Sequence, residues 1–278
     1  MGSSEKRELS RGAAWLSDRM MCLLIAIAVL AGPARSVGAE GFDASLSDPR
    51  AVQLADTILA SMGGKDAWES TRYLRFDMIS EKDGAQTLLT DQYWDKHTGR
   101  LRLEAKTDDG TPYVVLQNVN TGEGAVYIAG QRAAAEQEKA LLQKALSSWK
   151  SSIYWLFMPY KMKDPGVKLA WDGEEKLGDA TYDKVLVSFV STQDKFWAYI
   201  NRDTHLMDRW SFLLGGRSGE PVQYLWNGWR PYGKILIAPE RVSADGSRKL
   251  LFPHLTVFPE LPDSTFSSPE PVQVKAGS

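Results

Sequence analysis

The chain has 278 residues, of which 43% are hydrophobic and 24% charged, and its formal net charge is −2. This is the composition of an ordinary globular protein, and its slight negative charge argues against nucleic-acid binding, which needs a basic face. The only cysteine, Cys22, lies near the N-terminus, so we expect neither a disulfide nor thiol chemistry in the rest of the chain.

Residues 1–39 have the pattern of a secretory signal peptide. Residues 20–32 form an uncharged run of thirteen residues, which is short for a membrane span and follows a weakly positive segment. Small residues at 37–39 then match a cleavage site, so we expect cleavage after Ala39. An uncleaved N-terminal anchor is the alternative. Because Cys22 stands at the front of the apolar run, we do not expect processing as a lipoprotein.

A flexible lead over 40–48 and then a helix are expected next. Asp48 can cap the helix, and Pro49 suits its first position because proline lacks the N–H that would be unsatisfied there. Apolar residues recur at three- and four-residue spacing up to Met62, and the glycine pair 63–64 ends the pattern.

From Arg72 onward the apolar period changes to two, which is typical of antiparallel strands with one buried face. Turn dipeptides such as Asp83-Gly84 and Asp172-Gly173 separate the expected strands. The strands predicted before the central helix cover 72–78, 88–95, 100–105, 113–118 and 124–128. Those predicted after it cover 167–171, 182–190, 195–201, 206–214, 222–227, 234–238, 248–252 and 255–259.

Between these two sets of strands, the pattern predicts a helix over 133–149, followed by the aromatic segment 151–166. This segment, which we call the plug, contains Tyr154, Trp155, Phe157 and Met158 before it stops at Pro159. Such an apolar run must be buried. It is either ordinary core or a lid over an apolar cavity.

These elements predict an α+β protein with mostly antiparallel β structure. We expect one domain over 49–266, built as a strongly curved sheet with helices on its concave side, because a long sheet curls and needs its apolar face covered. The polar segment 267–278 is expected to be a disordered tail.

The sequence offers no recognisable catalytic or metal-binding pattern. His97, His205 and His254 are far apart and have no partner at ligand spacing, and the common nucleophile and phosphate-binding motifs do not occur. We therefore expect no catalytic residues, no metal and no cofactor. A pair of carboxylates in an aromatic cleft, as in glycosidases, is an open alternative that the sequence does not place.

Aromatic and apolar residues on strands are abundant, and the chain has ten tryptophans. A cavity lined by such side chains suits an acyl chain or another lipid, although packing alone can also explain many of them. Trp226 and Trp229 flank a predicted turn, which could bring them to the rim. The candidate ligand-binding residues are Phe76, Met78, Trp94, Leu101, Leu103, Tyr154, Trp155, Phe157, Met158, Trp210 and Trp226.

Three stretches together resemble a known family: YWLFMPYKMKDPGVKL at 154–169, DKFWAYINRDTHLMDRWSF at 194–212 and LPDSTFSSP at 261–269. They are similar to LolA-like proteins of outer-membrane lipoprotein sorting, over about residues 50–266. The resemblance implies an unclosed β-barrel plugged by helices, a hydrophobic cavity for acyl chains and a location in the periplasm.

The leading hypothesis is thus a monomeric periplasmic carrier or binder of lipoprotein acyl chains or another lipid, without catalysis. An envelope protein is a further partner to consider. The alternatives are an envelope enzyme acting on a sugar or lipid, and a lipid-sensing or scaffold protein whose cavity is only core.

Overall fold

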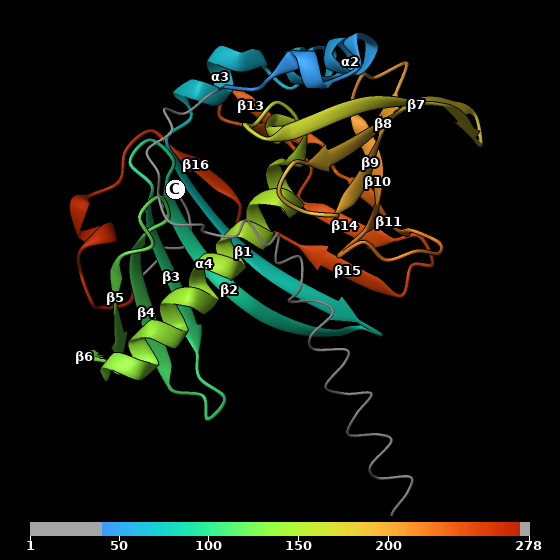
Figure 1. The fold of residues 1–278 in the computed structure, drawn as a ribbon. Helices are drawn as coiled ribbons and strands as arrows, with labels where there is room; N and C mark the ends of the chain where they lie inside the picture. Colours follow the sequence, from blue (N-terminus) through green and yellow to red (C-terminus); the bar gives the residue numbers. More distant parts are fainter. Residues whose placement is uncertain (1–40, 273–278) are drawn as a thin grey trace, which may run out of the picture.

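The computed structural model describes residues 41–272 (Figure 1). The predicted signal peptide, its cleavage after Ala39 and the last six residues of the predicted tail lie outside this range.

One curved antiparallel sheet of 14 strands forms most of the described chain. Its path runs β6-β5-β4-β3-β2-β1-β15-β14-β11-β10-β9-β8-β7, and β16 pairs with β1 beside it. The edge strands β6 and β7 do not pair with each other within residues 41–272, so the barrel is not closed. This confirms the predicted fold class.

The strands of the first half are β1 (Tyr73–Lys82), β2 (Ala85–Asp95), β3 (Arg100–Lys106), β4 (Pro112–Asn118), β5 (Gly124–Ile128) and β6 (Gln131–Arg132). Those of the second half are β7 (Val167–Leu177), β8 (Ala180–Phe189), β9 (Lys195–Asn201), β10 (Met207–Leu213), β11 (Val222–Asn227), β14 (Glu240–Ser243), β15 (Arg248–Leu251) and β16 (Thr256–Phe258). A separate hairpin joins β12 (Arg230–Tyr232) and β13 (Ile235–Ile237). The sequence pattern did not predict β6, β12 or β14, which are short.

Within residues 41–272, three α-helices accompany the sheet: α2 (Pro49–Ser61), α3 (Gly64–Ser70) and α4 (Ala135–Phe157). Short 3-10 turns are η1 (Ala44–Leu46), η2 (Met158–Lys161) and η3 (Asp263–Phe266). As predicted, Asp48 caps α2, accepting hydrogen bonds from the N–H groups of Arg50 (2.8 Å) and Ala51 (3.1 Å). Figure 1 shows α2 and α3 over one end of the sheet, while α4 crosses its concave side between β1–β5 and β7–β11.

The central helix is longer than predicted. We expected it to end at Trp149, but α4 continues through the first half of the plug to Phe157. The apolar stripe continues at helical spacing through Ile153 and Leu156, and no helix-breaking residue occurs before Pro159. The plug is therefore the C-terminal part of α4 followed by η2.

The predicted turn at Asp172-Gly173 is also wrong, because β7 runs through it. The pairing with β8 shifts between Trp171 and Glu174, and Gly173 has a φ of 94°. An irregularity of this kind admits a residue with positive φ without ending the strand. The chain reverses instead at residues 178–179.

Both ends of the described chain are attached to the sheet. In the expected lead, the Ser47 hydroxyl accepts a bond from the Leu169 N–H (3.0 Å), and the Asp48 N–H donates to the Leu169 carbonyl (2.8 Å). In the expected tail, the carbonyl of Ser268 accepts from the buried Arg102 (2.8 Å). Residues 41–48 and 267–272 thus have specific contacts that the polarity of these segments did not predict.

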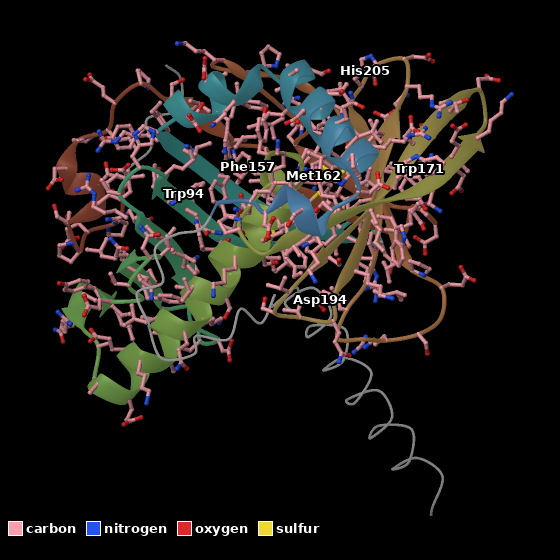
Figure 2. The ribbon with its side chains drawn as sticks, turned by 45° about the horizontal axis from the view of Figure 1, so that its top comes forward. Trp94, Phe157, Met162, Trp171, Asp194 and His205 are labelled. Carbon is pink, nitrogen blue, oxygen red and sulfur yellow. The ribbon has the colours of Figure 1, made fainter. Side chains whose placement is uncertain are left out.

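Buried apolar residues of the described chain form three clusters: a small one of Tyr73, Tyr93 and Phe266, and two that include residues of the α-helices, which we call the larger and the smaller core. The larger core joins α2, α3 and the C-terminal part of α4 to the strands of both halves. The smaller core lies under the N-terminal part of α4 and contains Leu103, Tyr113, Val115, Val126 and Ala145. Figure 2 shows Phe157 and Met162, both of the larger core, near the middle of the molecule, with Trp94 and Trp171 on opposite sides.

An ionic cluster around Asp183 ties α2 to the edge of the sheet. The Asp183 carboxylate accepts hydrogen bonds from Arg202 (2.8 and 3.0 Å), Arg50 (2.8 Å) and the Trp171 indole (3.2 Å). The hydrogen bond from Arg202 is the main reason that the pKa of Asp183 lies below its ordinary value. Since Arg50 belongs to α2, this carboxylate couples the helix to β7, β8 and the turn after β9.

We predict that Asp183→Asn lowers the melting temperature most at neutral pH. A lowered folded-state pKa means that the carboxylate stabilises the fold fully above its unfolded pKa of about 3.9, and that this contribution is lost as the pH falls through the folded value. The difference in Tm between wild type and variant should therefore shrink between pH 7 and about pH 3, as followed by thermal unfolding. Asp179→Asn, in an exposed turn, is the control. Equal differences at both pH values would contradict the prediction.

Candidate functional site

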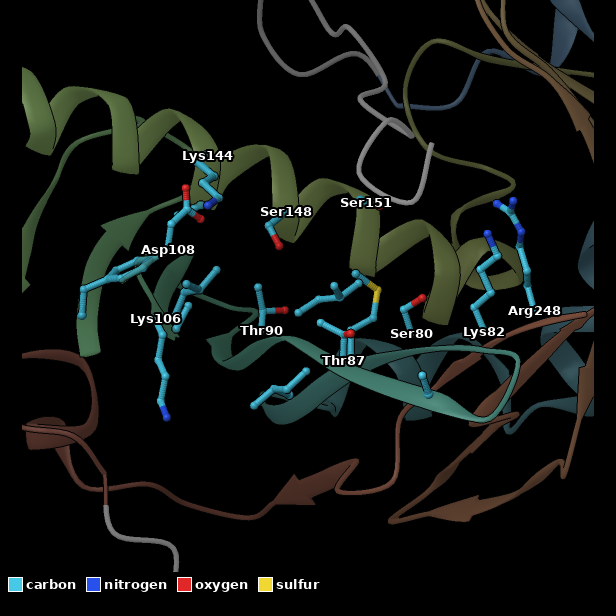
Figure 3. Close-up of a pocket in the computed structure, with 18 of the residues that line it drawn as sticks. Ser80, Lys82, Thr87, Thr90, Lys106, Asp108, Lys144, Ser148, Ser151 and Arg248 are labelled. Carbon is cyan, nitrogen blue, oxygen red and sulfur yellow. The ribbon is translucent and has the colours of Figure 1, made fainter. Parts of the chain in front are cut away.

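A groove lies between α4 and the strands of the first half of the sheet. Its volume is about 690 Å³, within the range of about 300–1,000 Å³ that is usual for small-molecule sites. Figure 3 shows it running beneath α4. It is lined by Met78, Ser80, Lys82, Asp83, Ala85, Thr87, Leu88, Leu89, Thr90, Leu103, Ala105, Lys106, Asp108, Tyr113, Lys144, Ala145, Ser148, Ser151 and Arg248.

The groove exists because α4 presents small side chains at this point. Ala145, Ser148 and Ser151 recur at a spacing of three residues and line the groove from the helix side. One turn later the stripe becomes large and aromatic, with Trp155 buried in the larger core. The short side chains leave space between helix and sheet that the large ones fill further along.

The groove also separates the two cores. Met78, on one wall, belongs to the larger core, whereas Leu103, Tyr113 and Ala145 belong to the smaller one. Buried apolar side chains of both cores therefore border the same space, which makes the floor of the groove mostly apolar.

A few polar groups stand against this apolar floor. Thr90 lines the groove, and its hydroxyl accepts a hydrogen bond from the side-chain amide of the buried Gln92 (2.8 Å), which also donates to the Ser152 hydroxyl (2.9 Å). The Ser151 hydroxyl is different: the residue is only 3% exposed, and this oxygen has no hydrogen-bond partner among the described residues. A buried hydroxyl without a partner costs free energy, and because the oxygen itself is buried, it does not face the open space of the groove.

Charged residues gather at the two ends of the groove. Figure 3 shows Lys82 and Arg248 together at one end, and Lys144 with Asp108 at the other. Lys106 extends away from α4 in the same view. With Asp83 included, the lining holds four cationic and two anionic side chains, although the chain as a whole has a net charge of −2.

Two of the eleven predicted ligand-binding residues, Met78 and Leu103, line this groove. The other nine are not part of its lining: Phe76, Trp94, Leu101, Tyr154, Trp155, Phe157, Met158, Trp210 and Trp226. Leu101 is buried in β3, and the remaining eight lie in or against the larger core. Direct ligand contact by these nine stays a prediction.

The large aromatic side chains of the plug belong to the larger core in this structure, and Ser151 is the one plug residue in the lining of the groove among the described residues. Trp155 is 4% exposed and meets the ring of Trp210 edge-on, with the centroids 4.7 Å apart. Trp226, expected near a rim, is buried and stacks on Trp229. The side chains of Trp155, Phe157 and Met158 are buried because they pack against residues on distant strands of the curved sheet, which is the core alternative of the sequence analysis.

The residues that sequence reasoning missed are the small ones on α4. The signal was present as two pairs of serines, 147–148 and 151–152, in the middle of a helical apolar stripe. Small polar residues at i and i+4 mark a point where a helix cannot pack tightly against its sheet. Because the predicted ligand-binding residues were all large apolar or aromatic ones, these serines were not among them.

Outside the groove, the described residues hold little that suggests catalysis. Within 41–272, no group of three or more histidine, cysteine, aspartate or glutamate side chains is placed to hold a metal ion. His254 pairs with the buried Asp77 through Nδ1 and Oδ2 at 2.7 Å, and Asp77 also accepts the His254 backbone N–H (3.0 Å). The same range contains no helix with the length and hydrophobicity needed to cross a membrane.

We predict that Phe157→Ala destabilises the protein by about 3–5 kcal/mol, because it removes a fully buried ring and leaves a cavity. Leu88→Ala is the matched control: Leu88 lines the groove but is 60% exposed, so its truncation should cost within about 0.5 kcal/mol. Denaturant unfolding measures both. If Phe157→Ala lowers the free energy of unfolding no more than Leu88→Ala does, the prediction that Phe157 is a core residue is wrong.

Comparison with known proteins gives only distant similarities. No protein-family model matches the sequence, and no curated protein matches it. Among solved structures, a DUF1329 family protein from Desulfovibrio piger is 13% identical, with 79% of this chain and 98% of that chain covered and a TM-score of 0.44. A LolA superfamily protein from Nitrosomonas europaea is 10% identical, with 76% and 96% covered and a TM-score of 0.42.

The MucA/MucB complex of Pseudomonas aeruginosa is also matched, at 12% identity and a TM-score of 0.20, with 76% of this chain and 60% of that chain covered. A LolA superfamily protein is thus among the solved structures to which the chain shows a distant similarity. These similarities are too distant to indicate a function, which must be inferred from the groove.

Proposed function

We propose that this protein binds an amphiphilic lipid or acyl chain in the groove beneath α4 and does not transform it chemically. The observation that carries the proposal is the groove of about 690 Å³ whose floor joins apolar side chains of both cores. An apolar site with a few polar groups is the usual form of a small-molecule site.

The lip of the groove supports a ligand with a hydrocarbon part. Leu88 is 60% exposed there, beside the apolar wall formed by Leu89 and Met78. Exposed leucine next to an apolar groove is unfavourable in water, and a bound hydrocarbon chain would cover it.

The chemistry of the lining supports binding more than catalysis. Among the described residues that line the groove there is no histidine and no cysteine, so Ser148 and Ser151 have no imidazole to act as a general base. The carboxylates Asp83 and Asp108 are exposed, whereas a catalytic acid usually needs a desolvated environment that raises its pKa. The enzyme hypothesis therefore has less support than the binding hypothesis.

The size of the groove favours a single-chain ligand. Its volume suits one drug-sized molecule, and a lipoprotein anchor with several acyl chains would require a larger space. The predicted export signal at residues 1–39 places the binder in the periplasm, where a lipid needs a protein to shield its chain from water. We therefore favour a periplasmic carrier or binder of a single-chain lipid over a lipoprotein carrier.

The test is to fill the groove from the helix side. Ser148 lines the groove and, in Figure 3, its side chain points toward the strands. We predict that Ser148→Phe weakens binding of a fluorescent fatty-acid probe at least about tenfold, because the added ring takes the space of the ligand. Fluorescence titration measures the affinity, and circular dichroism checks that the variant is folded.

The neighbouring serine supplies the control. Ser147 is exposed and does not line the groove, so Ser147→Phe should bind the probe as the wild type does. Absence of any binding by the wild-type protein, or equal binding by all three proteins, would contradict the proposed function.

A further inference from the structure

We propose that the ligand has a zwitterionic headgroup, with a phosphate and an ammonium group, and that this headgroup binds at the end of the groove formed by Lys144 and Asp108. The phosphate lies by Lys144 and the ammonium group by Asp108. The inference rests on the proposed function and adds the chemical class of the headgroup and its place in the groove.

A hairpin and the central helix bring these two residues together. Ala105 on β3 and Tyr113 on β4 are cross-strand partners, and Asp108 belongs to the turn that joins these strands. Lys144 lies on α4 next to Ala145, and both line the groove. Figure 3 shows Lys144 and Asp108 at the same end of the groove, with their side chains directed toward each other. This end therefore holds a cation from the helix and an anion from the sheet.

Neither of the two charges is paired. Lys144 and Asp108 are exposed, and within the described part of the chain neither forms an ion pair or a side-chain hydrogen bond, with each other or with another residue. Because both side chains are in water, pairing with a charge of the ligand costs little desolvation. A headgroup of one sign is attracted by one of them and repelled by the other, whereas a zwitterion is attracted by both.

The hydroxyl of Tyr113 adds a neutral hydrogen-bonding group at this end. Tyr113 lines the groove and is only 4% exposed, but its hydroxyl is not one of the described polar atoms that are buried without a partner. Burial raises the pKa of Tyr113, and the negative charge of Asp108 raises it further, as expected if the carboxylate is close to the phenol. A phosphodiester offers two anionic oxygens, so Lys144 and the Tyr113 hydroxyl can each donate to one of them.

The groove next to this end is apolar. Leu103, Ala105 and Ala145 line it there and lie in or against the smaller core. Across the sheet, the lining continues to Leu89 on β2 and Met78 on β1. A hydrocarbon chain can lie along this surface while the headgroup remains at the exposed end, in contact with water.

The experiment compares three ligands that share a palmitoyl chain and differ in headgroup. Displacement of a fluorescent fatty-acid probe, at concentrations below micelle formation, gives the affinities of lysophosphatidylethanolamine, lysophosphatidylglycerol and monopalmitoylglycerol. The first has a phosphate and an ammonium group, the second only the phosphate, and the third neither. For the wild-type protein we expect the first to bind about tenfold more tightly than the other two, because two exposed charge pairs each contribute modestly.

Two variants test the two charges separately. Asp108→Lys should reverse the preference, so that lysophosphatidylglycerol binds more tightly than lysophosphatidylethanolamine, because two cations then stand at this end. Lys144→Gln should weaken the binding of lysophosphatidylethanolamine at least about threefold. In both variants the affinity for monopalmitoylglycerol should stay within about twofold of wild type, which shows that the groove is intact. Lys139→Gln, an exposed lysine on α4 outside the groove lining, is the control and should behave as wild type.

The outcomes separate this inference from the proposed function. If the wild type binds all three ligands equally or prefers lysophosphatidylglycerol, or if either variant keeps the wild-type affinities, the headgroup inference is wrong while lipid binding stands. If the variants lose monopalmitoylglycerol as well, the two residues shape the groove and do not select the headgroup, which also overturns the inference. If the wild type binds neither the probe nor any of the three ligands, the proposed function itself fails.

Discussion

The central constraint on this structure is that one helix must cover the concave face of a sheet much wider than itself. The C-terminal part of α4 meets this demand with Trp155, Leu156 and Phe157, which pack against strands of both halves of the sheet. The N-terminal part packs in the smaller core with residues of β3, β4 and β5, and it presents smaller side chains such as Ala145 there. Because the covering is unequal, the interior divides into two cores with a groove between them.

As a result, different parts of α4 have different roles: one part stabilises the fold and another borders the proposed binding groove. Large rings at one end of α4 supply buried apolar area, and small residues one turn earlier leave the space in which a ligand can lie. Other features of the fold support this division. The ionic cluster at Asp183 holds α2 to the edge of the sheet, and Arg102 binds carbonyls of the C-terminal segment. Neither contact enters the groove, so both leave its shape to α4 and the strands.

The sequence predicted the elements well where a periodic apolar pattern existed, as in α2, whose cap at Asp48 is present, and in the strands of the first half. It predicted the curved, unclosed sheet, and its candidate cavity residues included Met78 and Leu103, which line the groove, together with nine that do not. Burial of rings against rings depends on strands far away in the chain, so Trp155 could not be assigned to core or lid from its neighbours alone. Arg241 is a second example: its guanidinium is fully buried 3.3 Å from the centre of the Trp226 ring, and no local pattern indicates that a charged residue lies there.

The most direct test of this account locates the hydrocarbon chain of a bound ligand. A crystal structure of the protein saturated with a fatty acid brominated along its chain would show the bromine by its anomalous scattering. The account predicts the peak under α4, near Met78 and Leu103, which both line the groove from the sheet. A peak among the rings of Trp155, Trp210 and Trp226, or a fully bound ligand located outside the groove, would contradict it.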